Sequence, residues 1–189
     1  DANKNPTGRR VTTNDYSSAD YYYVNKSSLP KVYGGFNTSL SWKGFDLSAI
    51  FAYSIGGYIY NRDITMILHN GSLEGRDWST EILRRWTPDN RYTDVPALST
   101  TSNNWNSAST RFLQNNSYMR LKNLTLSYNL PKQWISKLSL SSVQVYVQGD
   151  NLFTIHRNQG LDPEQGITGI TYYRYPAMRT ISGGINVSF

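Results

Sequence analysis

Aromatic side chains outside the regular strand patterns are the residues of this chain best suited to contact a ligand. Flat rings stack on sugars or peptides, and long loops on a rigid scaffold often carry binding sites. The candidates are Trp78, Trp86, Trp105, Tyr172, Tyr173 and Tyr175. For Trp78 and Trp86 the favoured interpretation is packing of a loop helix, whereas for Trp105 packing and ligand contact stay equally open.

The ionisable residues offer less chemistry. Asp162 and Glu164 lie two apart in GLDPE and suit a cation or a partner's arginine, but a turn shaped with Pro163 is the favoured interpretation. His69 and His156 are isolated and the chain has no cysteine, so we expect neither a metal site nor a cofactor. Because no Ser/His/Asp set or paired-carboxylate arrangement stands out, the chain is not predicted to be an enzyme.

Composition excludes two large classes of protein. Only 38% of the 189 residues are hydrophobic, and no apolar run approaches the roughly 20 residues of a membrane helix. The formal net charge is +6, but the basic residues do not gather on one face, as nucleic-acid binding requires. A β-barrel is compatible with this composition, because its strands are only half apolar and its loops are polar.

The elements that position the loops are predicted to be β-strands, and the clearest is the last stretch of the chain. From Ile181 onward the side chains alternate strictly, which is typical of a strand with one apolar and one polar side. The apolar side holds Ile181, Gly183, Ile185, Val187 and Phe189. An aromatic final residue is typical of a membrane barrel, which places rings at the lipid–water boundary.

Four further stretches carry the same alternation. Residues 36–42 form the first, and a two-residue turn at Lys43-Gly44 leads directly into the second, which extends to about residue 59. The third covers 117–131 and the fourth about 139–153. Five strands are too few to close a membrane barrel, which needs at least about eight, so we expect a part of a larger barrel.

The third strand changes parity in its first half. Met119 and Leu121 share the side that is polar further along, while Arg120 and Lys122 fall on the other. A β-bulge would explain this change, and so would a segment that stands above the membrane. The sequence leaves both explanations open.

The connections between strands alternate in length. The long ones are loops 61–116 and 154–176, and the short ones are turns 43–44 and 131–138. In outer-membrane barrels long loops face outward and short turns face the periplasm. We therefore expect residues 1–31 to form an extracellular loop and residues 32–189 to carry the barrel strands.

One short helix is predicted inside the first long loop. Trp78, Ile82 and Trp86 recur at four-residue spacing, which indicates an amphipathic helix. It is expected to begin near residues 77–79 and to end at Pro88.

Several stretches resemble the C-terminal end of SusC/RagA-type TonB-dependent outer-membrane transporters. They are RWTPDNRYTDVPAL (85–98), SYMRLKNLTLSYNLP (117–131), DNLFT (150–154), GLDPE (160–164) and YPAMRTISGGINVSF (175–189). The resemblance covers about residues 29–189. Together these motifs are specific, although each alone is short.

The resemblance implies the last five or so strands of a barrel of about 22 strands in the bacterial outer membrane. It also implies a plug that engages TonB, a SusD-like surface lipoprotein and energised import of oligosaccharides or peptides. This sequence contains no plug and no TonB box, so the stretch alone is not expected to transport. Its expected partners are therefore the rest of the barrel with its plug, the TonB complex through that plug, the lipoprotein and outer-membrane lipid. The barrel-assembly machinery is expected to recognise Phe189, Val187 and Ile185.

Two other functions fit the alternation. A soluble carbohydrate-binding or adhesive β-domain would bury the apolar sides in a core. A passive porin would share the barrel but lack the plug.

Overall fold

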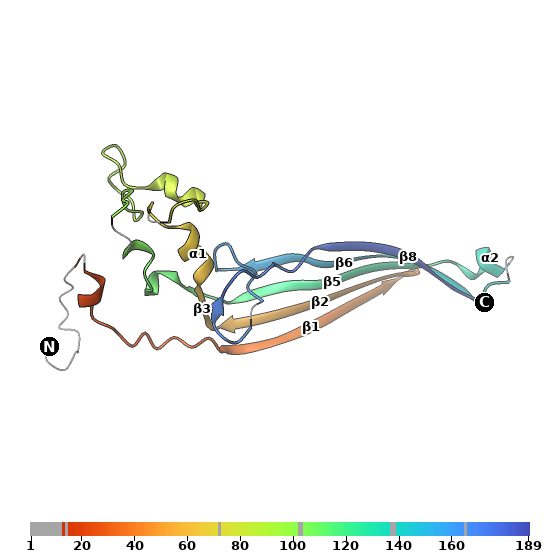
Figure 1. Ribbon diagram of the computed structural model, residues 1–189. Coiled ribbons are helices and arrows are strands. Elements are labelled where there is room, and N and C mark those ends of the chain that lie inside the picture. The colour runs from red at the N-terminus through yellow and green to blue at the C-terminus, as the bar shows by residue number, and fades with distance from the viewer. Residues whose placement is uncertain (1–12, 14, 72, 102–103, 137–138, 165) are drawn as a thin grey trace. The chain divides into compact units, whose positions relative to one another are not determined.

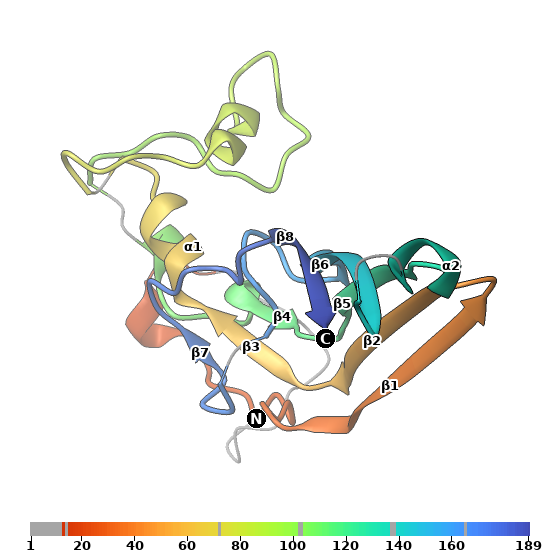
Figure 2. The ribbon, with the colours of Figure 1, turned by 90° about the vertical axis from the view of Figure 1, so that its right-hand side faces the viewer.

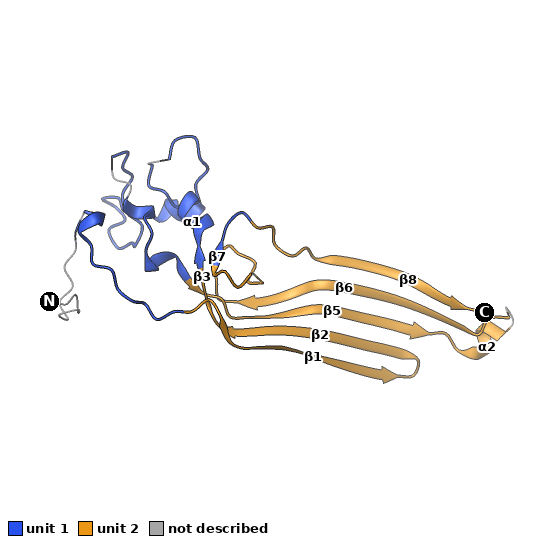
Figure 3. Cartoon of the chain, turned by 60° about the horizontal axis from the view of Figure 1, so that its bottom comes forward, with its two compact units in different colours: residues 1–26, 60–113, 170–173 blue, residues 27–59, 114–169, 174–189 orange. Residues whose placement is uncertain are grey.

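The computed structural model describes residues 13, 15–71, 73–101, 104–136, 139–164 and 166–189 (Figure 1). Residues 1–12 of the predicted loop 1–31 and residues 137–138 of the predicted turn 131–138 lie outside these ranges. The described residues divide into two compact units (Figure 3). Unit 1 comprises 1–26, 60–113 and 170–173, and unit 2 comprises 27–59, 114–169 and 174–189.

Strands dominate the described residues. The strands are β1 (Pro30–Trp42), β2 (Phe45–Gly56), β3 (Tyr58–Asn61), β4 (Leu113–Asn115), β5 (Tyr118–Asn129), β6 (Ser142–His156), β7 (Ile170–Thr171) and β8 (Thr180–Ser188). The helices are short: α1 (Arg62–Ile67), α2 (Lys132–Ile135) and the 3-10 turns Tyr16–Ser18, Thr80–Arg84, Asn104–Asn106 and Thr110–Phe112. No helix of the described ranges is long and apolar enough to cross a membrane.

Unit 2 is organised around an antiparallel sheet of five strands in the order β1-β2-β5-β6-β8. Figure 2 shows these strands side by side in one layer. The first hairpin closes with Trp42 opposite Phe45, and the turn between them has φ of 48° at Lys43 and 88° at Gly44. Positive φ at both central positions matches the right-handed twist of the strands, which explains why glycine is placed there.

A β-bulge at Lys122 accounts for the parity change in β5. Ile50 pairs with Asn123 and Phe51 with Leu121, so Lys122 has no partner on β2. The β5–β6 register shifts at the same place, between Leu121 and Asn123. Of the two explanations that the sequence left open, the structure therefore contains the bulge, because the extra residue turns the following side chains to the other face.

One face of the sheet is polar and linked across strands. Asn129 Nδ2 donates to Asp46 Oδ2 at 2.7 Å, Gln144 Nε2 donates to Asn129 Oδ1 at 3.2 Å, and Asn186 Nδ2 donates to Gln144 Oε1 at 3.2 Å. Asp46, Asn129, Gln144 and Asn186 belong to β2, β5, β6 and β8, so the chain of hydrogen bonds crosses four strands. Each bond satisfies a side chain that carries no apolar surface to bury.

The opposite face is apolar and exposed. One rung of facing residues contains Leu40, Leu47, Leu126, Val147 and Gly183. The four large side chains of this rung are all exposed. Aromatic pairs continue the face: Phe36 stacks on Phe51 at 4.7 Å between ring centroids, and Phe45 lies 4.5 Å from Tyr128. The sheet therefore presents its apolar side chains outward.

Several boundaries differ from the sequence-based ones. β1 begins at Pro30 rather than at residue 32, and β6 covers 142–156 rather than 139–153. β2 ends at Gly56 because Gly56 and Gly57 both have positive φ, 82° and 74°, which breaks the strand before β3. The helix α1, capped by the Asn61 side chain on Ile64 N at 3.0 Å, was not predicted.

The predicted loop helix is shorter than expected. It is a 3-10 turn, Thr80–Arg84, begun by Ser79, and it ends before Trp86 and Pro88. The carbonyl oxygen of Arg84 accepts hydrogen bonds from Thr93 Oγ1 at 2.6 Å and Asn90 Nδ2 at 3.0 Å. These side chains replace the next helical donors, so the chain leaves the helix there.

In its coarse form, the predicted fold class is confirmed: the chain is mostly β with few short helices.

Candidate ligand site

Arg120 on β5 is the most deeply buried cation of unit 2, with 3% of its surface exposed. Its Nη2 donates to Asp162 Oδ1 at 2.6 Å, its Nη1 to Glu164 Oε2 at 2.8 Å, and its Nε to Thr154 Oγ1 at 3.0 Å. Lys122 Nζ donates to both Glu164 carboxylate oxygens at 2.8 Å. We call these five residues the Arg120 cluster. It fastens the GLDPE segment to the sheet.

Asp162 joins two parts of the loop as well as the strand. Besides Arg120, it accepts hydrogen bonds from Glu164 N at 2.9 Å and Ala177 N at 2.6 Å. Burial alone would raise the pKa of the Asp162 carboxyl, but the backbone donors and the Arg120 guanidinium lower it overall. The carboxylate therefore stays ionised and holds the segments together.

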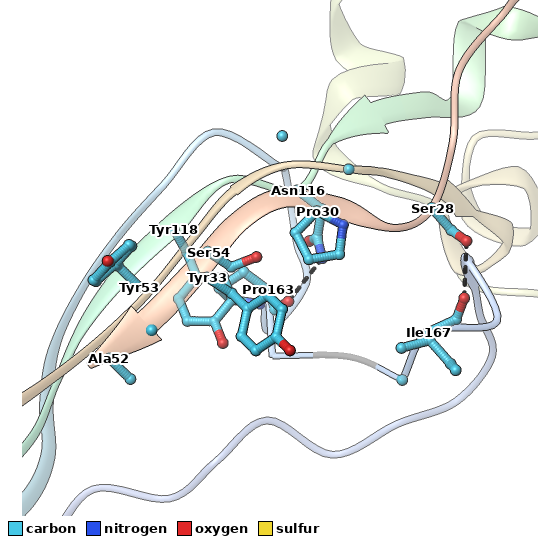
Figure 4. A pocket seen from close by; sticks show the side chains of 14 residues that line it. Ser28, Pro30, Tyr33, Ala52, Tyr53, Ser54, Asn116, Tyr118, Pro163 and Ile167 are labelled. Atoms are coloured by element: carbon cyan, nitrogen blue, oxygen red, sulfur yellow. Dashed lines mark hydrogen bonds between the residues drawn. The ribbon is translucent and has the colours of Figure 1, made fainter.

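A pocket of about 300 Å³ lies in unit 2 at the end of the sheet where β1 and β5 begin and β2 ends (Figure 4). We call it the tyrosine pocket. Its lining residues are Ser28, Pro30, Tyr33, Gly34, Ala52, Tyr53, Ser54, Gly56, Gly57, Asn116, Tyr118, Pro163, Gly166 and Ile167. Its wall therefore combines three strands with the segment that follows the Arg120 cluster's Asp162.

Two hydrogen bonds set the distance between that segment and the strands. Asn116 Nδ2 donates to Pro163 O at 2.9 Å, and Ser28 Oγ donates to Ile167 O at 2.8 Å (Figure 4). With the Arg120 cluster, they fix the loop wall at both ends. The pocket is thus built by residues far apart in the sequence.

The pocket offers neutral polar groups. Tyr33 faces Ser54, and Ser54 faces Tyr118, in one rung of the sheet, so their side chains share a face. None of these three hydroxyls makes a hydrogen bond to another residue in the described ranges. No lining side chain among the described residues carries a formal charge.

The sequence-predicted tryptophans lie in unit 1. The ring of Trp78 meets His69 edge-on at 5.2 Å, and Trp86 is partly exposed while its backbone N donates to Val95 O at 2.8 Å. The Arg111 guanidinium lies 3.4 Å from the centre of the Trp105 ring. The buried Nε1 of Trp105 has no hydrogen-bond partner in the described part of the chain.

Of the predicted tyrosines, two lie against acidic and basic neighbours. The Arg62 guanidinium covers the Tyr172 ring at 4.7 Å, and Asp63 accepts a hydrogen bond from Tyr173 N at 2.9 Å. Tyr175 is exposed. None of the six predicted aromatics lines the tyrosine pocket, and their role in ligand contact stays a prediction.

The two histidines lie apart from the pocket. His69 is fully buried, which lowers the pKa of its imidazole, and the nearby charge of Arg76 lowers it further. His156 Nδ1 lies 3.0 Å from Asn158 O. Within the described ranges no three His, Cys, Asp or Glu side chains gather as metal ligands.

The last residues of β8 lie on the apolar face. Ile185 faces Val145 and Val187 faces Val143, while Phe189 beyond the strand is 92% exposed. Their proposed recognition by the assembly machinery stays a prediction.

Sequence reasoning did not find Arg120, Tyr33 or Tyr118 as site residues. The one available signal was the parity change around Arg120, together with an acidic pair in GLDPE that had no basic partner nearby in sequence. Asp162 and Glu164 were expected chiefly to shape a turn. The structure adds an intramolecular partner, Arg120, in place of the cation or foreign arginine considered for them.

The chain is similar to three curated proteins along most of its length. It is 34% identical over 166 residues to TonB-dependent receptor P3 of Formosa agariphila, covering 82% of this chain and 16% of that protein. It is 31% identical to TonB-dependent receptor P26 of the same organism, covering 91% and 18%. With TonB-dependent receptor SusC of Bacteroides thetaiotaomicron the identity is 27%, covering 88% and 16%. The chain thus spans less than a fifth of each relative.

Solved structures give the same result. The RagAB peptide importer in its closed-closed state has a TM-score of 0.82 and 35% identity, covering 98% of this chain and 20% of that chain. In its open-open state the values are 0.81 and 36%, covering 95% and 19%. No protein-family model matches the chain.

Proposed function

This chain belongs to the SusC/RagA-type TonB-dependent receptors, and from that membership we propose that it is the C-terminal part of an outer-membrane importer's transmembrane barrel. The five strands would be the last of about 22. Short turns 43–44 and 131–138 would then face the periplasm. Residues 1–31 and loops 61–116 and 154–176 would face outward.

The observation that carries the proposal is the opposite character of the two faces of one sheet layer. The polar face satisfies its side chains by cross-strand hydrogen bonds, as a water-filled lumen allows. The apolar face, with Leu47, Leu126 and Val147, is exposed. An apolar patch of this extent needs an apolar neighbour, and outer-membrane lipid supplies one for a barrel wall.

The edges of the sheet define the first partner. β1 and β8 each pair on one side only, which leaves a row of backbone donors and acceptors on the other. In lipid each unsatisfied group costs several kcal/mol, so both edges must pair with the remaining strands of the barrel. The plug, and through it the TonB complex, would belong to that remaining part.

For the cargo we propose oligosaccharides or peptides, delivered with a SusD-like surface lipoprotein. Two similarities support this pair of classes: SusC is a TonB-dependent receptor, and RagAB is a peptide importer.

The alternative, a soluble carbohydrate-binding or adhesive β-domain, requires burial of the apolar face in a core. That face is exposed throughout the described part of the sheet, which favours the membrane proposal.

Adjacent residues on opposite faces provide the test. In the full-length protein, Leu47→Arg places a charge toward lipid and should cost about 2–4 kcal/mol near the bilayer centre, whereas Ser48→Arg points into the lumen. We expect the first variant to lose outer-membrane level and heat-modifiable mobility, and the second to keep both. Equal behaviour of the two variants, or recovery of the native protein as a soluble folded monomer, would refute the proposal.

Deleting Phe189 tests the proposed assembly signal. Because its ring is exposed beyond β8, its loss removes little internal packing, and we expect outer-membrane levels to fall more than ligand affinity. Quantitative blotting of membrane fractions, with binding assayed on the protein that does assemble, measures both. Normal membrane levels of the deletion variant would contradict the assignment.

A further inference from the structure

The tyrosine pocket is a preformed concavity with unusual chemistry for a wall of strands. Tyr33, Ser54 and Tyr118 occupy neighbouring positions of one rung, so three hydroxyl groups rise from the same face of the sheet. Figure 4 shows the two tyrosine rings beside Pro163, which lies on the opposite loop wall. Since the hydroxyls have no hydrogen-bond partner in the described ranges, their donors and acceptors are free for a ligand.

The lining selects against charge. A carboxylate or ammonium group that entered the pocket would lose water without gaining an ion pair, because the described lining residues carry no formal charge. The nearby cations do not change this. Arg120 and Lys122 are already engaged with Asp162 and Glu164 at 2.6–2.8 Å. A neutral ligand group is therefore favoured over a charged peptide terminus or side chain.

The lining also selects for a ring. Tyrosine and proline side chains are flat and apolar on their faces, and tyrosine carries a polar group at its edge. A pyranose has the matching arrangement, with apolar ring faces and hydroxyls around its edge. A volume of about 300 Å³ lies at the small end of ligand pockets, which suits a single ring better than an extended chain.

We propose that the tyrosine pocket binds one uncharged pyranose unit of a glycan, stacked against Tyr33 or Tyr118 and hydrogen-bonded by their hydroxyls and by Ser54. The Arg120 cluster acts at a distance, since it positions Pro163 and the loop wall and does not itself line the pocket. This inference rests on the proposed import function, because it names the cargo class of one site inside that transporter.

Binding of the full-length, detergent-purified protein to an array of neutral glycans tests the proposal, with terminally blocked peptides on the same array. We expect neutral glycans to bind. Removing one hydroxyl in Tyr118→Phe should weaken binding about threefold to tenfold, the factor of one net hydrogen bond. Tyr33→Ala should weaken it at least as much. Tyr92→Ala, an exposed tyrosine of unit 1, serves as the control and should change nothing.

Three results would overturn the proposal: no neutral glycan bound, preference for peptides or charged glycans, or glycan binding insensitive to both pocket variants. Heat-modifiable mobility of every variant excludes misfolding as the cause of a loss, and Tyr118→Phe keeps the ring and its packing. The membrane location of the same preparations is scored separately. A correctly assembled transporter that ignores neutral glycans would refute the pocket assignment alone, whereas failure to reach the membrane would refute the import function.

Discussion

The two units of this chain distribute apolar and charged residues in opposite ways. Unit 1 buries Leu68, Ile82, Val95 and Phe112, and its Arg84 pairs at the surface with Glu81 and with Asp94. Unit 2 buries the pair Arg120–Asp162, while most large apolar side chains of its sheet are exposed.

The difference teaches which surroundings each unit requires. A small apolar core with charges outside is the arrangement that water favours. An exposed apolar face combined with buried, fully hydrogen-bonded charges suits an apolar surrounding, where polar groups must find partners inside the protein. We therefore expect substitutions to have opposite ranks in the two units.

The largest effect is expected from the two ion pairs. Arg120→Met leaves Asp162 and Glu164 without their shared buried partner and should destabilise unit 2 by about 3–5 kcal/mol. Arg84→Met removes an exposed pair of unit 1 and should cost no more than about 1 kcal/mol. Denaturant unfolding of the full-length protein in detergent, with protease sensitivity of loop 157–179 as a second readout, compares them. Similar losses in both variants would break the contrast between the units.

The next effect concerns a matched pair of valines. Val95 in unit 1 is 2% exposed and Val147 in unit 2 is 48% exposed. Val95→Ala should cost about 2 kcal/mol through lost burial and a cavity, whereas Val147→Ala should stay within about 0.5 kcal/mol. Hydrogen exchange of the amides around each site measures both. A larger loss at Val147 would mean that its face packs against protein rather than lipid.

A smaller, pH-dependent effect is expected in unit 1. Burial lowers the pKa of His69, so below about pH 6.5 the unfolded segment takes up a proton that the folded segment refuses. Stability of unit 1 is therefore complete above that pH and falls as the pH drops through it. Hydrogen exchange of residues 61–71 at pH 7.5 and 5.0, corrected for intrinsic rates, should show this loss, and His69→Gln should remove it. An unchanged profile in the variant would contradict the assignment to His69.

The lowered pKa of Asp162 gives unit 2 the opposite profile. The stability it contributes is present above the carboxyl's ordinary pKa of 3.8 and is lost only as the pH falls through the still lower folded value. The Arg120 cluster should thus hold unchanged between pH 7.5 and 5.0, where unit 1 weakens.

The sequence by itself determined the strands, the first hairpin and the two faces of the sheet. Each follows from neighbours in the chain, because a strand alternates its side chains every two residues and Lys43-Gly44 supports a tight turn whatever surrounds it. The motifs that resemble SusC/RagA transporters were readable for the same reason, as continuous stretches of residues.

Only the tertiary structure decided the site. Arg120 and Asp162 are separated by 42 positions, and their meeting depends on the bulge at Lys122 and on the path of the loop after β6. The tyrosine pocket likewise needs the register of three strands before Tyr33, Ser54 and Tyr118 share a rung. Register and loop path are set by contacts distant in the chain, so no local pattern of residue types contains them.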